Sequence, residues 1–153
     1  CVGEWCTCAQ GWGAQRGQAG ASGRRARTAL GMLEIRDVVG KGRGVFAQKR
    51  FAPGELIEQA PVIVLPNAQA GFLDQTLLKD YYYHWDEASV ALALGFGSLY
   101  NHAYAPNAYY VKSVQEALIK FVALRTIEVG EEITVNYNGD PTDQAALWFA
   151  VID

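Results

Sequence analysis

Cysteine is scarce in this 153-residue chain, whose three cysteines, Cys1, Cys6 and Cys8, all stand at its very beginning. This argues against a fold built on disulfides and against a cysteine-ligated zinc in the body of the chain. Only two histidines are present, His84 and His102, so ligands for any metal are few and we predict no metal site. The same pattern favours a reducing compartment, and we expect a cytoplasmic protein, or a nuclear one if the source is eukaryotic.

Long hydrophobic runs are also missing. No stretch approaches the roughly 18 consecutive apolar residues that a membrane-spanning helix requires. Half of the residues are nevertheless hydrophobic, at 50%, which is enough for one well-packed core in a chain of this length. We therefore expect a single globular domain without a membrane anchor.

The composition changes near residue 31. The stretch "GWGAQRGQAGASGRRARTALG" is rich in glycine, alanine and arginine and has no apolar period, which is typical of a disordered tail. The only methionine, Met32, directly precedes the first strand-like stretch. We interpret residues 1–31 as a disordered or non-native extension and residues 32–153 as the domain. A genuine basic tail that touches nucleic acid is the alternative.

Charge is divided in the same way. The first 31 residues carry four arginines and one glutamate, a net +3, so a total of −3 leaves −6 on the remainder. An acidic body is a poor candidate for direct binding of nucleic acid and a better one for attracting cationic peptides.

The order of apolar runs and turn residues predicts a mostly β protein made of small twisted sheets. The predicted strands cover 33–38, 45–51, two runs within 56–66 split by Pro61, 90–97, a hairpin of 107–114 with 117–124, and a short strand after a turn at 129–131. Mixed three-to-four spacing predicts a helix over 72–85, and "DPTDQAALWFA" carries helix-start signals from residue 140.

The motif "NHAYAPN", from Asn101 to Asn107, is the most unusual stretch. A metal centre would need further ligands nearby, and a serine or cysteine hydrolase would need a nucleophile on a sharp turn. The chain has no G-x-S-x-G segment, and its cysteines lie far from the motif. A histidine beside an asparagine in an irregular loop is usually a hydrogen-bonded structural pair.

Three motifs taken together point further: "GKGRGVFA", "NHAYAPN" and "GEEITVNY". Their order, spacing and wording resemble the SET-domain family of protein lysine methyltransferases, whose motifs run G-x-G, N-H-S-x-x-P-N and G-E-E-L-x-x-x-Y. The resemblance covers Leu33 to Phe149. The chain looks like the compact, stand-alone members found in bacteria and viruses, because the zinc-binding cysteine cluster that often follows the domain is absent.

The resemblance implies both a fold and a reaction. The expected fold is mostly β, with several small twisted sheets, few short helices, and a C-terminal pseudoknot formed by the N-H segment and the last strand. The expected cofactor is S-adenosylmethionine, bound on one face, and the target lysine of a protein substrate enters a narrow channel from the other. A basic substrate segment, such as a histone-like tail, suits the acidic body.

The resemblance also assigns residues. Gly42 and Gly44 lack a Cβ, so their backbone can approach a cofactor and adopt positive φ. Pro106 and Asn107 match a structural turn beside the pseudoknot. The implied cofactor-binding residues are Lys41, Gly42, Arg43, Gly44, Asn101, His102, Trp148 and Phe149. The implied substrate-channel residues are Tyr82, Tyr100, Tyr104 and Tyr137, and Tyr137 is the expected catalytic residue, which orients the amine.

The chain departs from the family pattern at Ala103, where serine is usual, and at Val135 and Asn136, where many members have tyrosine and aspartate. These changes motivate an alternative: a catalytically silent SET module that binds a peptide or protein partner. Exposed aromatic residues also allow a homodimer.

Overall fold

The structure, a computed structural model, describes residues 31–151. The predicted N-terminal extension therefore lies, except for Gly31, outside the described residues. The described part is mostly β and contains one short α-helix. Its elements are β1 (Leu33–Val38), β2 (Gly42–Ala47), β3 (Leu56–Pro66), α1 (Asn67–Leu73), the 3₁₀ helix η2 (Leu77–Asp80), β4 (Tyr82–Asp86), β5 (Ser89–Ala93), β6 (Asn101–His102), β7 (Ala108–Ser113), β8 (Leu118–Ala123) and β9 (Glu132–Val135).

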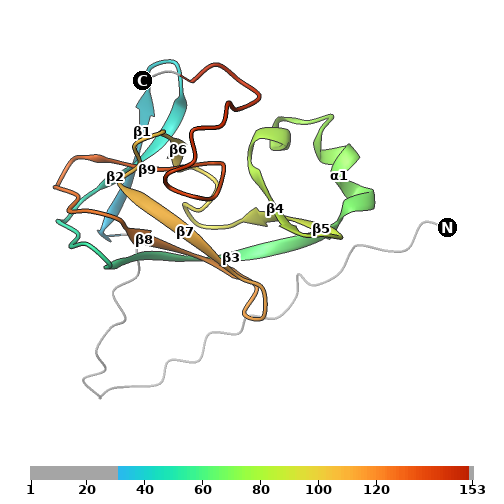
Figure 1. Ribbon diagram of the computed structural model, residues 1–153, viewed down its shortest axis with the longest axis horizontal. Coiled ribbons are helices and arrows are strands. Elements are labelled where there is room, and N and C mark those ends of the chain that lie inside the picture. The colour runs from blue at the N-terminus through green and yellow to red at the C-terminus, as the bar shows by residue number, and fades with distance from the viewer. Residues whose placement is uncertain (1–30, 152–153) are drawn as a thin grey trace, which may run out of the picture.

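The smaller sheet has the strand order β1-β2-β9-β6 (Figure 1). β1 and β2 form an antiparallel hairpin, whose turn uses Gly40 and Gly42 at φ of +80°. β6 runs parallel to β9 and aligns Asn101 with Thr134 and His102 with Val135. Two motifs separated by about thirty residues of sequence are thus placed side by side, as the predicted pseudoknot requires.

The larger sheet has the order β4-β5-β3-β8-β7 and is strongly curled. Its two edge strands approach each other: Lys112 Nζ on β7 donates a hydrogen bond to the carbonyl of His84 on β4 at 2.9 Å. The rings of Tyr83 and Tyr110, also from these strands, are 5.3 Å apart. The curl therefore brings the ends of the sheet together around an aromatic interior.

β3 is a single long strand, although Pro61 was expected to divide it. Its first half pairs with β8 and its second half, from Val62, pairs with β5. Pro61 stands where the partner changes, and its carbonyl accepts a hydrogen bond from Leu94 N at 2.8 Å. A proline is tolerated in such a place because its missing N–H is not required by a continuous ladder.

The hydrophobic core joins the two sheets. On β8, buried and partly exposed side chains alternate along the strand, as a sheet with one covered face requires. Phe121 and Tyr100 pack ring against ring at a centroid distance of 4.3 Å in the centre of this core. The fully buried large side chains also include Val45, Phe51, Ile119, Ile127, Ile133 and Val135.

Two helix predictions are wrong. The segment 72–85 contains the end of α1, the 3₁₀ turn η2 and the strand β4, because β4 pairs with β5 and buries Trp85 there. From residue 140 the chain forms turns instead of a helix. Asp140 and Asp143 each accept a hydrogen bond from a backbone N–H two residues onward, which competes with helix formation. The predicted hairpin and the last strand are confirmed.

No helix within residues 31–151 is long and apolar enough to cross a membrane.

Candidate active site

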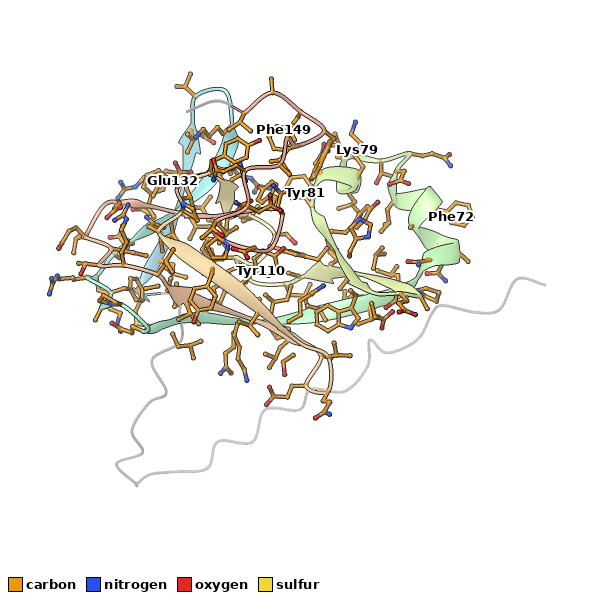
Figure 2. The ribbon with its side chains drawn as sticks, viewed as in Figure 1. Phe72, Lys79, Tyr81, Tyr110, Glu132 and Phe149 are labelled. Carbon is orange, nitrogen blue, oxygen red and sulfur yellow. The ribbon has the colours of Figure 1, made fainter. Side chains whose placement is uncertain are left out.

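Two pockets lie next to each other and share a wall. The first has a volume of about 700 Å³ and is lined from the two edges of the curled sheet, with Tyr82, Tyr83 and His84 on β4 and Tyr110 and Lys112 on β7. The second, of about 500 Å³, is lined by the turn around Lys41, by β6, and by the C-terminal segment. Both are lined by Lys79, Asp80, Tyr81, Ser98, Tyr137 and Trp148. In the view of Figure 2, Tyr81 lies between Phe149 of the second pocket and Tyr110 of the first.

Tyr137 stands at this shared wall, two residues after the end of β9. Its hydroxyl donates a hydrogen bond to the carbonyl of Tyr100 at 2.9 Å, and its backbone N–H donates to His102 Nδ1 at 3.1 Å. Burial, more than the nearby Tyr81 and Glu132, raises the pKa of Tyr137 to about 12. The phenol is therefore protonated at neutral pH, and its proton is directed toward the Tyr100 carbonyl.

His102 positions its neighbours. Because Nδ1 accepts from the Tyr137 N–H, that nitrogen carries no proton in this arrangement. The ring of Tyr104 lies edge-on to His102 at 4.6 Å, and the Tyr104 hydroxyl contacts the carbonyl of Ala145 at 3.3 Å. Tyr104, predicted as a channel residue, lines neither of these two pockets and instead packs the C-terminal segment against β6.

Gly42 and Gly44, the second and third glycines of "GKGRG", have different roles. Gly42 adopts positive φ, as predicted, whereas Gly44 does not. A Cβ on Gly44 would lie 2.8 Å from Asn101 Nδ2 and would also meet the Glu132 carboxylate, to which Asn101 is hydrogen-bonded at 2.7 Å. Gly44 thus allows β2 to approach the β6–β9 pair. Lys41 and Arg43 line the second pocket, as does Gly40, whereas Gly42 and Gly44 do not.

Asn107 fastens the same region from the other side. Its side-chain amide donates to the carbonyl of Glu132 at 2.7 Å and to the Glu131 carboxylate at 3.1 Å, and its oxygen accepts from Thr134 N at 2.9 Å. The asparagine thereby occupies backbone groups of β9 in the way a neighbouring strand would. The turn predicted for Pro106 and Asn107 is therefore also a clamp on the last strand.

The remaining predicted residues line the pockets. Tyr82 and Tyr100 line the first, with their hydroxyls bonded to Asp74 and Glu58 respectively, each at 2.9 Å. The second pocket is lined by Asn101, His102, Trp148 and Phe149 in addition to Lys41 and Arg43. Trp148 stacks on the ring of Tyr137 at 6.4 Å with an interplanar angle of 20°.

Sequence reasoning missed several lining residues. Tyr81, Tyr83, Tyr110, Lys79 and Asp80 line the pockets but are not among the site residues predicted from the sequence. The run "YYYHWD" was interpreted as a helix. Interpreted as a strand, its alternation would have directed Tyr83 to the opposite face from Tyr82. Tyr83 does point inward, where its hydroxyl donates to Gly97 O at 2.5 Å and where burial raises its pKa well above the ordinary value.

Within residues 31–151, no group of three or more His, Cys, Asp or Glu side chains could hold a metal ion.

A family model, the SET domain, matches residues 42–138. The chain belongs to the SET domain family. It is 40% identical over 118 residues to a Schizosaccharomyces pombe protein named "Histone-lysine N-methyltransferase, H3 lysine-37 specific", with 76% of each chain covered. By this homology the SET domain described above is a protein-lysine N-methyltransferase, and the family implies an S-adenosylmethionine donor.

The fold agrees with that assignment. The crystal structure of a "Plasmodium falciparum putative histone methyltransferase" matches with a TM-score of 0.55 and 28% identity, over 69% of this chain and 92% of that one. The predicted mostly β SET fold is confirmed, with two sheets in place of several. Both relatives come from eukaryotes, and the likeness to compact bacterial and viral members, which rested on the absence of a cysteine cluster, stays a prediction.

Proposed function

We propose that this SET domain transfers a methyl group from S-adenosylmethionine to a lysine side chain of a histone, in the nucleus. One observation carries the proposal: two pockets of different character meet at Tyr137. A donor in one and a lysine in the other would face each other across that residue. An in-line methyl transfer mainly requires that the enzyme hold the donor methyl group and the amine in line with each other.

The second pocket fits the donor in size and chemistry. Its volume, about 500 Å³, lies within the range of roughly 300–1,000 Å³ typical of small-molecule sites. Lys41 and Arg43 offer cations for a carboxylate, and Trp148 and Phe149 offer apolar rings for a flat heterocycle. These residues, with Asn101 and His102, would hold S-adenosylmethionine. When bound, it supplies an electrophilic methyl group on a positively charged sulfur.

The first pocket favours the neutral form of the substrate amine. A free lysine side chain has a pKa of about 10.4, and the amine must be neutral to attack. Desolvation by the aromatic walls of the pocket, from Tyr83, Tyr110 and Tyr137, disfavours the charged form. Tyr137 is itself protonated and donates to Tyr100, so it serves as a hydrogen-bond acceptor that orients the amine and does not act as a base.

The departures from the family pattern have structural explanations. Val135 is fully buried in the core, and Asn136 Nδ2 donates to the carbonyl of Asp143 at 2.6 Å, which fixes the C-terminal segment over the site. Ala103 continues the pairing of β6 with β9 through its N–H to Val135 O at 3.1 Å. None of these three residues lines either pocket, which supports activity over the silent-module alternative.

The substrate proposal follows from the relative and from charge. The S. pombe relative is named for lysine 37 of histone H3, so a peptide around that lysine is the first to test. The net charge of −6 beyond residue 31 suits the basic tail of a histone.

The test is transfer of radiolabelled methyl to histone H3, compared between wild type and Tyr137→Phe. We expect label on lysine in the wild type and a loss of about 100-fold or more in kcat in the variant, because the amine loses its orienting oxygen. The KM for S-adenosylmethionine should change little.

Tyr109→Phe is the matched control, since Tyr109 lines neither pocket and lies on the same hairpin as Tyr110. It should retain wild-type transfer. Donor binding by calorimetry with no transfer to any histone would support the silent module instead, and absence of donor binding would remove the basis of the proposal.

We extend the proposal to self-association. Phe72, Leu77 and Trp148 are exposed by 71%, 85% and 70%, and pairing of two chains would cover such side chains. Sedimentation of the full chain at increasing concentration tests this, and a mass that stays at 16.7 kDa would rule it out.

A further inference from the structure

Glu58 is a buried carboxylate that lies behind the first pocket without lining it. Its side chain leaves the strand near the start of β3, and the residue is only 6% exposed. Oε1 accepts a hydrogen bond from Phe96 N and Oε2 accepts one from the Tyr100 hydroxyl, each at 2.9 Å. Burying a charge is costly unless it is bonded, and this burial raises the pKa of Glu58. A group retained at such a cost calls for an explanation.

The turn that Glu58 holds, residues 94–100, is built closely around it. Gly95 has a φ of +66°, and a Cβ on it would collide with the Glu58 carboxylate. Gly97 approaches so closely that its Cβ would lie 2.7 Å from that of Ala60 on β3. Gly95 thus lets the carboxylate approach this turn, and Gly97 lets the turn approach β3 itself.

The same turn positions tyrosines of the first pocket. The Tyr83 hydroxyl donates to Gly97 O, and the Tyr137 hydroxyl donates to Tyr100 O. Tyr100 itself lines the pocket. A continuous series of contacts therefore leads from Glu58 through the Tyr100 side chain and backbone to the hydroxyl of Tyr137.

We propose that Glu58 is a positioning residue for the lysine pocket: by anchoring Phe96 N and the Tyr100 hydroxyl, it fixes the carbonyl that holds Tyr137. Its kinetic consequence rests on the methyl transfer proposed above. A carboxylate suits the role because it accepts through both oxygens, and the two groups facing it are both donors. Glutamine can replace it if the Tyr100 hydroxyl rotates to accept from the amide, whereas leucine can bond to neither partner.

The kinetic test compares Glu58→Gln, Glu58→Leu and Tyr100→Phe with wild type on histone H3. We expect Glu58→Leu to lower kcat by about tenfold or more, with the KM for S-adenosylmethionine within about twofold. Glu58→Gln should recover most of kcat. The double variant Glu58→Leu with Tyr100→Phe should be no slower than Glu58→Leu alone, because both changes break the same link. Glu116→Leu, an exposed glutamate on the β7–β8 turn, is the control for loss of a charge.

Each outcome decides the proposal. An unchanged kcat in folded Glu58→Leu overturns it, as does a glutamine variant that falls as far as the leucine variant. Additive losses in the double variant would mean that Glu58 does not act through Tyr100. If Glu58→Leu does not fold, Tyr100→Phe against Glu58→Gln gives the same comparison, since the first breaks the link and the second preserves it.

A spectroscopic measurement separates this proposal from the proposed function. In protein labelled with ¹³C at the tyrosine ring, the Tyr137 resonance is assigned by its absence from Tyr137→Phe. We expect this resonance to shift in Tyr100→Phe and in Glu58→Leu and to stay near its wild-type position in Glu58→Gln and Glu116→Leu. A Tyr137 signal unaffected by Glu58→Leu overturns the positioning role even if no methyl transfer is observed.

Discussion

Two regions that border the same pockets differ in how they are held in place: one by buried polar side chains, the other by a segment that begins with few buried residues. The knot region, residues 101–107 with 130–138, buries the polar side chains of Asn101, His102, Asn107 and Asn136. The first three are hydrogen-bonded to residues within 132–137, which lie 25 to 35 positions away in sequence. Asn136 is hydrogen-bonded to Asp143 in the C-terminal segment. The insert, residues 67–86, begins with α1 and η2, in which no residue is buried.

This difference matches what each region faces. The knot region borders the pocket proposed for the donor, a small molecule of constant shape, and buried hydrogen bonds fix such a site firmly. The insert shares Lys79, Asp80 and Tyr81 with both pockets, and its strand β4 lines only the pocket proposed for the lysine, which must admit a protein chain. A segment with few buried contacts opens locally at low free energy. Paired substitutions, one in each region, can test the comparison.

The largest expected difference comes from removing an asparagine in each region. Asn107→Leu leaves the N–H of Thr134 and the carbonyl of Glu132 buried without their side-chain partner, so we expect a loss of about 3 kcal/mol in the free energy of unfolding. Asn67→Leu removes one exposed bond, to the carbonyl of Glu87, which water can replace, and should cost no more than about 0.5 kcal/mol. Urea denaturation measures both, and equal losses would contradict the comparison.

Glycine to alanine should change stability in opposite directions. In Gly44→Ala the new methyl meets Asn101 and the Glu132 carboxylate, and we expect a loss of about 2 kcal/mol from overpacking. In Gly71→Ala, on α1, the methyl meets nothing within 4 Å, so better helix propensity should add about 0.5–1 kcal/mol. The same denaturation experiment applies. A stabilising Gly44→Ala would show that β2 can move away from the β6–β9 pair.

The knot region was predictable because its signal lies in residue identity. Asn101, His102, Asn107 and Tyr137 are specific groups whose hydrogen bonds depend on their chemistry, and the motifs that carry them stand in order along the chain. Their partners were not predictable. Asn101 and Glu132 require a glycine at position 44, and Glu58 bonds to Tyr100. Both contacts join segments that lie far apart in sequence, so the sequence alone does not reveal them.

The insert was predicted poorly for the opposite reason. Its aromatic run satisfies the spacing of a helix nearly as well as that of a strand, and the choice is made by pairing with β5. The C-terminal segment failed similarly: helix-start residues at 140–143 instead cap turns, and the chain is held by Asn136 and Tyr104. Where tertiary contacts decide between helix and strand, local propensity predicts the secondary structure poorly.

A pH titration tests the cost of burying Glu58, whose carboxylate bonds to Tyr100 just before the knot region. Burial raises the folded-state pKa of Glu58 above its usual 4.5, so its contribution to stability is fully present below the unfolded pKa and is lost as pH rises through the folded pKa. Glutamine does not titrate. The free energy of unfolding of Glu58→Gln, relative to wild type, should therefore increase from about pH 4 to about pH 7. A difference that is constant with pH would mean that Glu58 titrates normally.

The smallest expected effect is on the surface of the insert. Phe72 lies on α1 (Figure 2). Its side chain is 71% exposed, so Phe72→Ser should change the free energy of unfolding of the isolated chain by no more than about 0.5 kcal/mol. The change is informative because of this small cost: any larger effect on the KM for histone H3 would arise from contact with the substrate and not from unfolding. Stability that falls well beyond this limit would show that the insert packs as firmly as the knot region, and the contrast between the two would be lost.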